Sequence, residues 1–111
     1  MSTGIATRKD KANAKRAESK PWRKTILCVD DDLNLLAIRR RLLENAGYLV
    51  LTTPSGLESL KVFSTGIVDA VILDYEMPIM NGGDVAAQMH RMKDDVPLIL
   101  VSGAIILQEN L

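Results

Sequence analysis

The sequence predicts a doubly wound α/β domain, and three features of the chain support this. Short apolar runs alternate with segments in which apolar residues recur at helical spacing. The runs lack polar residues at alternate positions, which indicates strands buried on both faces, as in parallel sheets covered by helices. Polar residues follow each run where a strand would end. The order β-α-β-α-β-α-β, with short units, specifies right-handed crossovers and helices on both faces of the sheet.

Each element is expected where the spacing changes. The expected strands are Thr25–Val29, Tyr48–Thr53, Asp69–Leu73 and Leu98–Val101. The expected helices are Leu33–Ala46, which stops at Gly47, then Leu57 to about Ser64, and Asp84–Lys93. The apolar residues at core-facing spacing are Leu35, Leu36, Ile38, Leu42 and Leu43 in the first helix, Leu60 and Phe63 in the second, and Val85, Met89 and Met92 in the third. Arg39, Arg40 and Arg41 are expected mostly to face water.

Composition places the chain among small soluble domains, and its charge is unevenly distributed. With 111 residues, 47% hydrophobic and 25% charged, one globular domain is expected over residues 25–111. Residues 1–24 hold eight Lys or Arg and two acidic residues, which leaves −6 for the remainder of a neutral chain. We expect this segment to be a mostly disordered basic tail, and favour a solvated extension over a nucleic-acid-binding one.

Cysteine usage and hydropathy point to a cytoplasmic protein. Cys28 is the only cysteine, so no disulfide framework within the chain is possible and a reducing compartment is the simplest setting. Cys28 lies in an apolar run, where a buried thiol is expected. No apolar run approaches the roughly 18 residues that a membrane span needs, and the N-terminus lacks the apolar core of a secretory signal.

The stretch Val71–Gly83 carries the first candidate site residue. Its apolar run stops at the carboxylate of Asp74, and Pro78 and the Asn-Gly-Gly that follows predict a loop. In doubly wound sheets, ligands bind at the carboxyl ends of the strands. Asp74 is therefore expected at the functional edge of the sheet, although an isolated Asp after a strand is more often a simple turn residue.

A second group of carboxylates follows the first strand. Asp32 is accounted for as the N-cap of the next helix, whereas Asp30 and Asp31 are not. In the flavodoxin-like strand order 2-1-3-4-5, the first and third strands are neighbours, so Asp30, Asp31 and Asp74 converge. Such a cluster is costly without a cation, and hard oxygen ligands of this kind suit Mg²⁺. Mg²⁺ would also let Asp74 act as a nucleophile toward a phosphoryl group, to which Ser102 could donate a hydrogen bond.

Four motifs together resemble the receiver domain of two-component response regulators. They are VDDD after the first strand, ILDYEMP at the third, the MNGG turn, and LVSGA at the fourth. The resemblance covers about Thr25 to the C-terminus. It implies a CheY-like fold and a phosphorelay protein that is not an enzyme beyond its own phosphorylation and dephosphorylation. It also implies a histidine kinase or phosphotransfer protein as the partner that supplies the phosphoryl group.

The resemblance assigns a role to each candidate residue. Asp74 is implied as the phosphoacceptor and a metal ligand, Asp31 as a direct Mg²⁺ ligand, and Asp30 as a ligand acting mainly through water. The backbone carbonyl of Glu76 completes the implied ligand set, and Ser102 matches the switch hydroxyl. Phosphorylation is then expected to draw this hydroxyl inward and to repack the face around the fourth strand.

The chain departs from the receiver pattern after Ser102. A receiver normally continues to a fifth strand that carries a Lys and then to a fifth helix, whereas no Lys follows Ser102 and Leu111 is reached before either element is expected. Strand four would then be a bare sheet edge, and part of the apolar face beside the first helix would be uncovered. Loss of the Lys would slow or prevent phosphorylation, and we expect self-association through the exposed edge strand.

Two other hypotheses stay open from the sequence. The chain could be a degenerate or truncated receiver that acts only as an interaction module, or a nonfunctional fragment, as the missing Lys suggests. It could also be a Mg²⁺-dependent phosphohydrolase with Asp74 as nucleophile, because Glu76 stands where such enzymes carry a second acid. Turnover of a phosphomonoester that is lost in Asp74→Asn would support the hydrolase.

Overall fold

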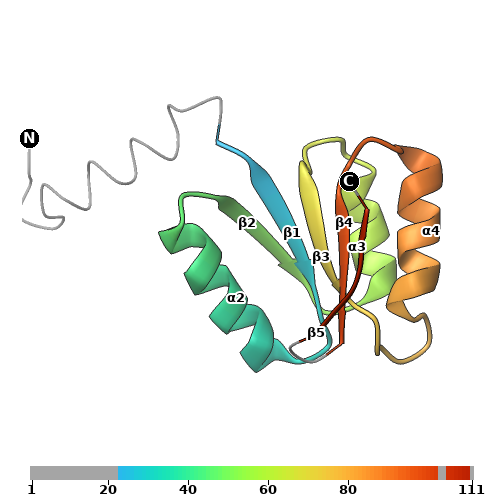
Figure 1. Cartoon of the computed structure of the whole chain (residues 1–111), viewed down its shortest axis with the longest axis horizontal. Helices are drawn as coiled ribbons and strands as arrows, with labels where there is room; N and C mark the ends of the chain where they lie inside the picture. Colours follow the sequence, from blue (N-terminus) through green and yellow to red (C-terminus); the bar gives the residue numbers. More distant parts are fainter. Residues whose placement is uncertain (1–22, 103–104, 111) are drawn as a thin grey trace, which may run out of the picture.

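A computed structural model describes the backbone of residues 23–102 and 105–110 (Figure 1). The elements, in chain order, are β1 (Thr25–Val29), α2 (Leu33–Asn45), β2 (Leu49–Thr53), α3 (Gly56–Phe63), β3 (Ala70–Asp74), α4 (Gly82–Met92), β4 (Leu98–Ser102) and β5 (Ile105–Asn110). Apart from Arg23 and Lys24, the predicted basic tail lies outside the described residues. None of the helices described here has the length and apolar character that crossing a membrane requires.

The sheet has the strand order β2-β1-β3-β4-β5. The first four strands are parallel, and the register pairs Cys28 of β1 with both Thr52 of β2 and Ile72 of β3. Strands β1 and β3 are therefore neighbours although a helix, a strand and a second helix separate them in the sequence. This confirms the predicted flavodoxin-like order, and it brings the carboxyl ends of β1 and β3 to one edge of the sheet.

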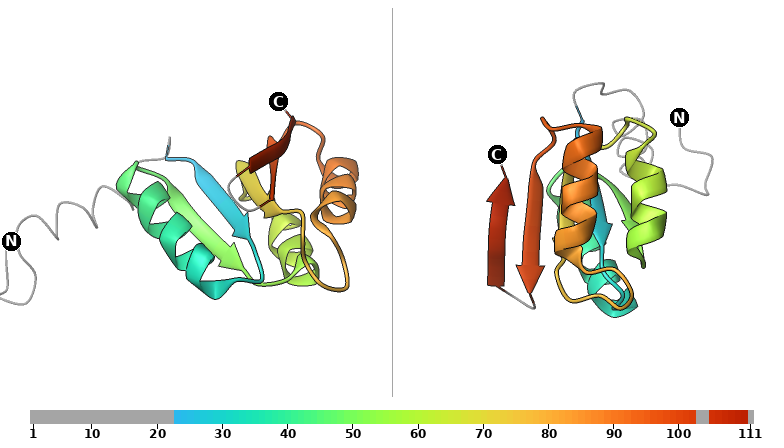
Figure 2. Two further views of the ribbon diagram at one scale, coloured as in Figure 1. Left: turned by 60° about the horizontal axis from the view of Figure 1, so that its bottom comes forward. Right: turned by 90° about the vertical axis from the view of Figure 1, so that its right-hand side faces the viewer.

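The prediction that no fifth strand could form is wrong. β5 pairs with β4 in the antiparallel direction, with Leu100 opposite Gln108, and it runs beside β4 in Figure 2. A parallel fifth strand would need a crossover of a dozen or more residues, whereas an antiparallel one can follow a short connection, and only two residues separate Ser102 from Ile105 in the sequence. β4 is therefore not a bare edge, and the two edge strands of the described sheet are β2 and β5.

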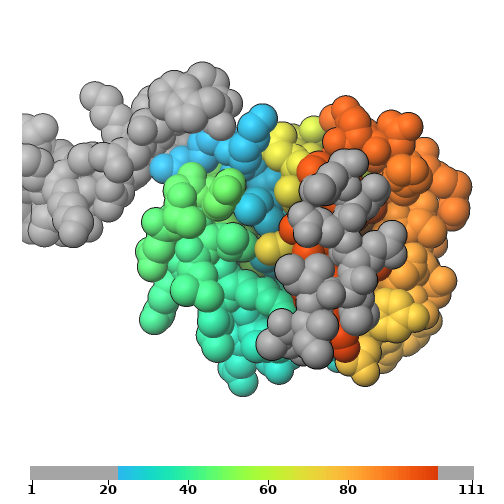
Figure 3. All heavy atoms as spheres, viewed as in Figure 1, coloured from blue at the N-terminus to red at the C-terminus, as the bar shows by residue number. Residues whose placement is uncertain are grey.

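Helices cover the two faces of the sheet unequally. Helices α3 and α4 pack on one face, where Leu27, Val71, Leu73 and Leu98 belong to the larger buried cluster. Helix α2 lies on the other face, over a smaller cluster of Ile26, Cys28, Leu36 and Val50. Figure 1 shows α2 on the opposite side of the sheet from α3 and α4, and Figure 3 shows α2 and α4 as opposite flanks of the molecule.

Three residues assigned to the core by their spacing are exposed instead. The side chains of Ile38 and Leu42 are 55% and 63% exposed, and Met92 is also exposed. Only Leu36 of α2 is buried, because the helix contacts β1 and β2 and no described element lies beside its Ile38–Leu42 stripe. An uncovered apolar stripe on the first helix therefore agrees with the expectation from the sequence.

The buried thiol of Cys28 supplies a test of the packing beneath α2. Cys28 is fully buried, and burial raises the pKa of its thiol to about 11, although the Arg39 and Arg40 guanidinium groups act in the opposite direction. At pH 8 roughly a thousandth of this thiol would be ionised, against about a quarter in an unfolded chain. We expect a disulfide reagent to modify Cys28 only after the chain is unfolded in denaturant. Native-state modification at the unfolded rate would contradict the packing.

Candidate functional site

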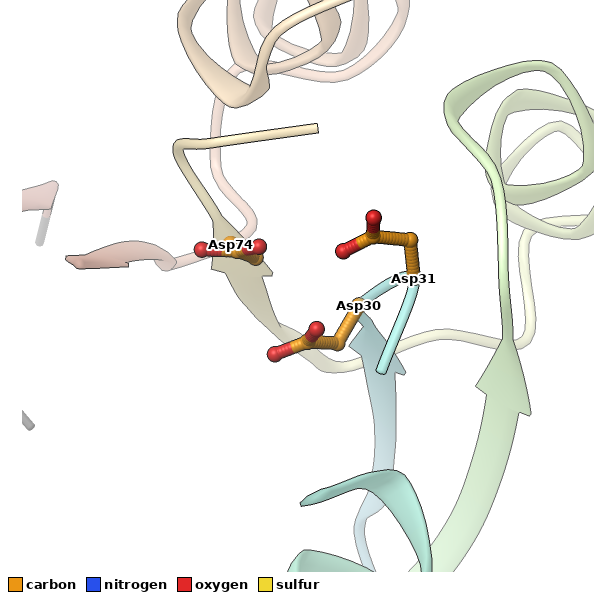
Figure 4. Close-up of side chains that lie close together, drawn as sticks. All are labelled: Asp30, Asp31 and Asp74. Carbon is orange, nitrogen blue, oxygen red and sulfur yellow. The ribbon is translucent and has the colours of Figure 1, made fainter. Parts of the chain in front are cut away.

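Three carboxylates meet where β1 and β3 end. Asp30 and Asp31 directly follow β1, and Asp74 is the last residue of β3. Each offers a carboxylate oxygen, and these oxygens lie within 4.8 Å of one another. Figure 4 shows the three side chains around one shared space, and the structure thus brings together the residues whose convergence the strand order predicts. The exposed side chain of Asp31 opens this cluster to solvent.

Asp30 is buried, with 2% of its surface exposed, and both of its oxygens have partners. Its Oδ1 accepts a hydrogen bond from the backbone N–H of Asp32 at 2.8 Å. Its Oδ2 forms an ion pair with the Arg39 guanidinium, also at 2.8 Å. The expectation that Arg39 faces water is therefore wrong, since its side chain is only 18% exposed.

Arg39 is the functional candidate that sequence reasoning missed. It stands in a run of three arginines on an amphipathic helix, a pattern that predicts a solvated face, and residue type alone does not separate it from Arg40 and Arg41. Its position nine residues after Asp30 places it on the second turn of α2, from which a long side chain reaches back to the strand end. The converging carboxylates thus have a compensating cation, supplied by an arginine.

Asp32 fulfils the structural role predicted for it. It is the N-cap of α2, and its Oδ1 accepts hydrogen bonds from the backbone N–H groups of Asn34 at 3.0 Å and Leu35 at 3.2 Å. Of the three consecutive acids, Asp32 therefore orders the helix, and Asp30 and Asp31 remain for the site.

Asp74 is an ionisable group in a shielded position, with 8% of its surface exposed. Burial raises the pKa of its carboxyl above the ordinary value, and the negative charges of Asp30 and Asp31 raise it further. A hydrogen bond from the backbone N–H of Glu76 to Oδ1, at 3.3 Å, and the charge of Arg39 act in the opposite direction. The ionised form of Asp74 is thus short of stabilising partners, as expected of a carboxylate arranged to meet a cation.

The loop after Asp74 is held tightly against the strand end. Asn81 caps α4 by accepting a hydrogen bond from the N–H of Asp84 at 2.9 Å, so the helix begins two residues before its predicted start. The N–H of Gly82 donates to the carbonyl of Tyr75 at 2.9 Å. A Cβ on Gly82 would overlap the carbonyl oxygen of Asp74 and lie 2.8 Å from the Cα of Tyr75. Only glycine fits at this approach, which fixes the backbone next to Asp74.

Ser102 lies at the same edge of the sheet, at the end of β4. Its neighbour Val101 is the register partner of Asp74, and the Val101 carbonyl accepts a hydrogen bond from the N–H of Tyr75 at 2.8 Å. The Ser102 hydroxyl donates to Oε1 of Glu76 at 2.7 Å. The structure therefore places Ser102 and Glu76 beside the acidic cluster and links their side chains to each other.

The donor set of the cluster fits a hard divalent cation. Asp30, Asp31 and Asp74 offer only oxygen donors, and three converging carboxylates with one arginine leave an excess of negative charge. The site offers only a few protein oxygens and is open to solvent. Such a site suits Mg²⁺, which keeps several water ligands, whereas Ca²⁺ is usually enclosed by more protein oxygens. The described β5 contains no Lys, so it adds no cation to this edge.

Replacing Asp74 with asparagine is expected to stabilise the metal-free chain. The pKa of Asp74 is higher in the folded chain than in the unfolded chain. The free energy of unfolding therefore falls as pH rises through the folded-state pKa, and above it the ionised carboxylate destabilises the fold. Removing the charge at pH 7 in EDTA should raise the melting temperature by about 4–8 °C, the shift that roughly 1 kcal/mol produces in a small domain. The gain should shrink toward acid pH and when Mg²⁺ is added, because Mg²⁺ stabilises the wild type more.

The matched control for this prediction is Asp95→Asn, at an exposed position outside the cluster. It should leave the melting temperature and its response to Mg²⁺ unchanged. If Asp74→Asn and Asp95→Asn behaved alike in both conditions, the electrostatic account of the cluster would be wrong.

Comparison with known proteins identifies relatives over most of the described chain. Residues 26–109 match the family model of the response regulator receiver domain. The response regulator SaeR of Staphylococcus aureus is 39% identical over 77 residues, which are 69% of this chain and 33% of SaeR. The chain thus spans about a third of the length of the curated relatives it matches.

Solved structures share the fold. The response regulator TrrA of Thermotoga maritima, solved in complex with Mg(2+)-BeF, has a TM-score of 0.69 and 40% identity, covering 71% of this chain and 69% of that chain. TrrA in complex with the histidine kinase ThkA matches with the same score and identity, over 72% of this chain and 69% of that chain. The chemotaxis protein CheY4 of Vibrio cholerae has a TM-score of 0.64 and 29% identity, over 70% and 67%.

Proposed function

Because the chain belongs to the response regulator receiver family, we propose that it accepts a phosphoryl group on Asp74 in a two-component phosphorelay. The observation that carries this proposal is the convergence of Asp30, Asp31 and Asp74 at the carboxyl ends of two neighbouring strands. A single Asp after a strand supports little, whereas three carboxylates at one edge of this fold support a metal-assisted phosphoryl site.

The proposed reaction is a direct transfer between side chains. One oxygen of the Asp74 carboxylate attacks the phosphorus of a phosphohistidine, the new P–O bond forms, and the electron pair of the broken P–N bond leaves with the histidine nitrogen. Asp31, Asp74 and the Glu76 carbonyl would hold Mg²⁺, with Asp30 acting mainly through water. The ion supplies charge neutralisation between two anions. The N–H of Glu76 orients Asp74, and Ser102 donates to the phosphoryl oxygens once they are in place.

We propose a histidine kinase or a phosphotransfer protein as the phosphoryl donor. TrrA, at 40% identity, was solved bound to a histidine kinase, which supports a partner of this class. A cytoplasmic location follows from the same proposal, since such partners present their phosphohistidine there. We further propose that the receiver unit spans residues 25–111 and that the basic segment of residues 1–24 lies outside it.

The test of this function is the intact mass of the purified chain after incubation with Mg²⁺ and a small-molecule phosphodonor such as acetyl phosphate. We expect a single phosphoryl adduct in the wild type, dependent on Mg²⁺ and absent in Asp74→Asn. No adduct in a wild-type chain with a folded circular dichroism spectrum would contradict the proposal. That result would favour a degenerate receiver that acts only as an interaction module.

The hydrolase hypothesis has less support from the site. Its general acid-base would be Glu76, but the Glu76 carboxylate accepts a hydrogen bond from Ser102. While this hydrogen bond lasts, Oε1 of Glu76 is not available to activate water. Steady turnover of a phosphomonoester, lost in Asp74→Asn, would be needed to restore this hypothesis.

Self-association is a further prediction. Because β5 pairs with β4, the edge strand available for it is β5 and not β4. We propose that β5, an edge strand of the described sheet, and the exposed stripe of Ile38 and Leu42 on α2 favour association between copies. Light scattering across a concentration series should give a mass that rises above that of the monomer. Ile38→Asp combined with Leu42→Asp should lower this mass if the stripe takes part, and a monomeric wild type at every concentration would contradict the prediction.

A further inference from the structure

The hydrogen bond between Ser102 and Glu76 joins two functional segments that are far apart in sequence. The Ser102 hydroxyl donates to Oε1 of Glu76 at 2.7 Å, a typical length for a hydroxyl donating to a carboxylate. Ser102 ends β4, and Glu76 lies two residues beyond Asp74 in the loop that leads to α4. The bond therefore ties the end of β4 to the loop that carries the phosphoacceptor.

This bond occupies the only proton that the Ser102 hydroxyl can donate. A hydroxyl has one donor hydrogen, so Ser102 serves one strong acceptor at a time. In the described structure the acceptor is Glu76, while Oδ1 of Asp74 accepts from the backbone N–H of Glu76. A phosphoryl group on Asp74 would place new anionic oxygens at the same sheet edge and would compete for the same proton.

Charge favours an exchange of acceptors once Asp74 is modified. The Glu76 side chain is exposed, so it can rotate into solvent without desolvating an ionised group. A phosphoryl group would add negative charge to an edge that already holds Asp30, Asp31 and Asp74. Glu76 is the exposed carboxylate of this edge that accepts the Ser102 proton, whereas Asp30 is buried and paired with Arg39.

We propose that Glu76 is a positioning residue that holds the Ser102 hydroxyl in the unphosphorylated chain and releases it when Asp74 is phosphorylated. The Ser102 hydrogen bond is then exchanged from Glu76 Oε1 to a phosphoryl oxygen, with no covalent change at either side chain. The strength of the Glu76 contact sets how readily the hydroxyl turns inward. This proposal rests on the proposed function, since it requires a phosphoryl group on Asp74.

The test is a double-mutant cycle read through beryllofluoride with Mg²⁺, a non-covalent mimic of the phosphoryl group. Apparent affinities are measured for the wild type, Glu76→Ala, Ser102→Ala and the double variant. Removing Glu76 also removes a negative charge, so affinity should rise in both backgrounds. Release of the Ser102 hydroxyl should add to this gain only when Ser102 is present. The gain in beryllofluoride affinity from Glu76→Ala should therefore be roughly three- to tenfold larger with Ser102 than in the Ser102→Ala background.

Glu76→Gln is the conservative variant that separates charge from hydrogen bonding. Its side-chain carbonyl still accepts from Ser102, so it should recover much of the hold on the hydroxyl while it lacks the charge. We expect its affinity to lie between those of the wild type and Glu76→Ala. Equal gains from Glu76→Ala with and without the Ser102 hydroxyl would overturn the proposal.

The same four chains in EDTA distinguish failure of this inference from failure of the proposed function. In the unphosphorylated chain the Ser102–Glu76 bond should appear as a coupling in thermal stability, with no phosphoryl mimic needed. A stability coupling without any binding of beryllofluoride would refute the phosphoryl exchange and the proposed function together. Binding of beryllofluoride without any coupling in either cycle would refute the role of Glu76 alone.

Discussion

Replacing Arg39 with methionine is expected to destabilise the metal-free chain by roughly 2–3 kcal/mol and to tighten its binding of Mg²⁺. Arg39 is the ion-pair partner of Asp30, which is buried, so the variant leaves a buried carboxylate with only the N–H of Asp32. Removing one partner of a buried pair costs more than the pair contributes, because the remaining charge is uncompensated. Methionine preserves most of the side-chain length and isolates the effect of the charge.

The gain in Mg²⁺ affinity has the same origin as the loss of stability. Without the guanidinium the cluster of Asp30, Asp31 and Asp74 is more negative, and affinity should rise roughly three- to tenfold. By linkage, saturating Mg²⁺ should return part of the lost stability. Arg41→Met is the matched control, because Arg41 is exposed on the same helix and forms no ion pair with an acidic residue of the described chain.

Chemical denaturation with and without Mg²⁺, together with calorimetric titration of Mg²⁺, measures both effects. Arg41→Met should resemble the wild type in each. Equal stabilities of Arg39→Met and Arg41→Met in EDTA would show that the guanidinium is not the counter-charge of Asp30. Weaker Mg²⁺ binding in Arg39→Met would contradict the proposed competition between the arginine and the metal.

Gly82→Ala is expected to destabilise the fold by about 3 kcal/mol and to weaken both Mg²⁺ binding and phosphorylation. The added methyl group would meet the Asp74 carbonyl and the Tyr75 Cα, which are backbone atoms that cannot rotate away. The β3–α4 loop must then move, and the carboxylate of Asp74 moves with it. Mg²⁺ binding and phosphorylation should therefore fall by more than the fraction of unfolded chain accounts for.

Gly83→Ala is the control for this prediction because it lies next to Gly82 in the first turn of α4. Its added methyl group would lie 3.2 Å from Oδ1 of Asn81 and 3.3 Å from Cε1 of Tyr75, both side-chain atoms that can shift slightly. Alanine is also the better helix former, so Gly83→Ala should be close to neutral. Denaturant midpoints that are equal for the two variants would contradict the close approach at Gly82.

Much of the fold and of the candidate site could be predicted because both depend on short-range patterns. Apolar runs located the ends of the four parallel strands to within one residue, and the strand order then brought Asp30 and Asp31 beside Asp74. Asp32 was identified as the helix N-cap from its type and place alone. These features follow from strand period, capping chemistry and the general topology of parallel sheets.

The features that could not be predicted depend on tertiary contacts. β5 was missed because a receiver-like parallel strand was expected, whereas Ile105–Asn110 pairs with β4 in the antiparallel direction. Helical spacing alone did not show which side of α2 is covered, so Ile38 and Leu42 were assigned to the core. Arg39 was assigned to solvent because its partner, Asp30, is defined only after the strand and helix pack.

The central claim is that Asp74, among the three converging carboxylates, receives the phosphoryl group. The most direct measurement is reductive trapping of the phosphorylated chain with borohydride, which converts an aspartyl phosphate to homoserine, followed by peptide mass spectrometry. The account predicts homoserine at position 74, dependent on both Mg²⁺ and the phosphodonor. Homoserine at position 30 or 31, or none from a chain that carries the phosphoryl adduct, would contradict it.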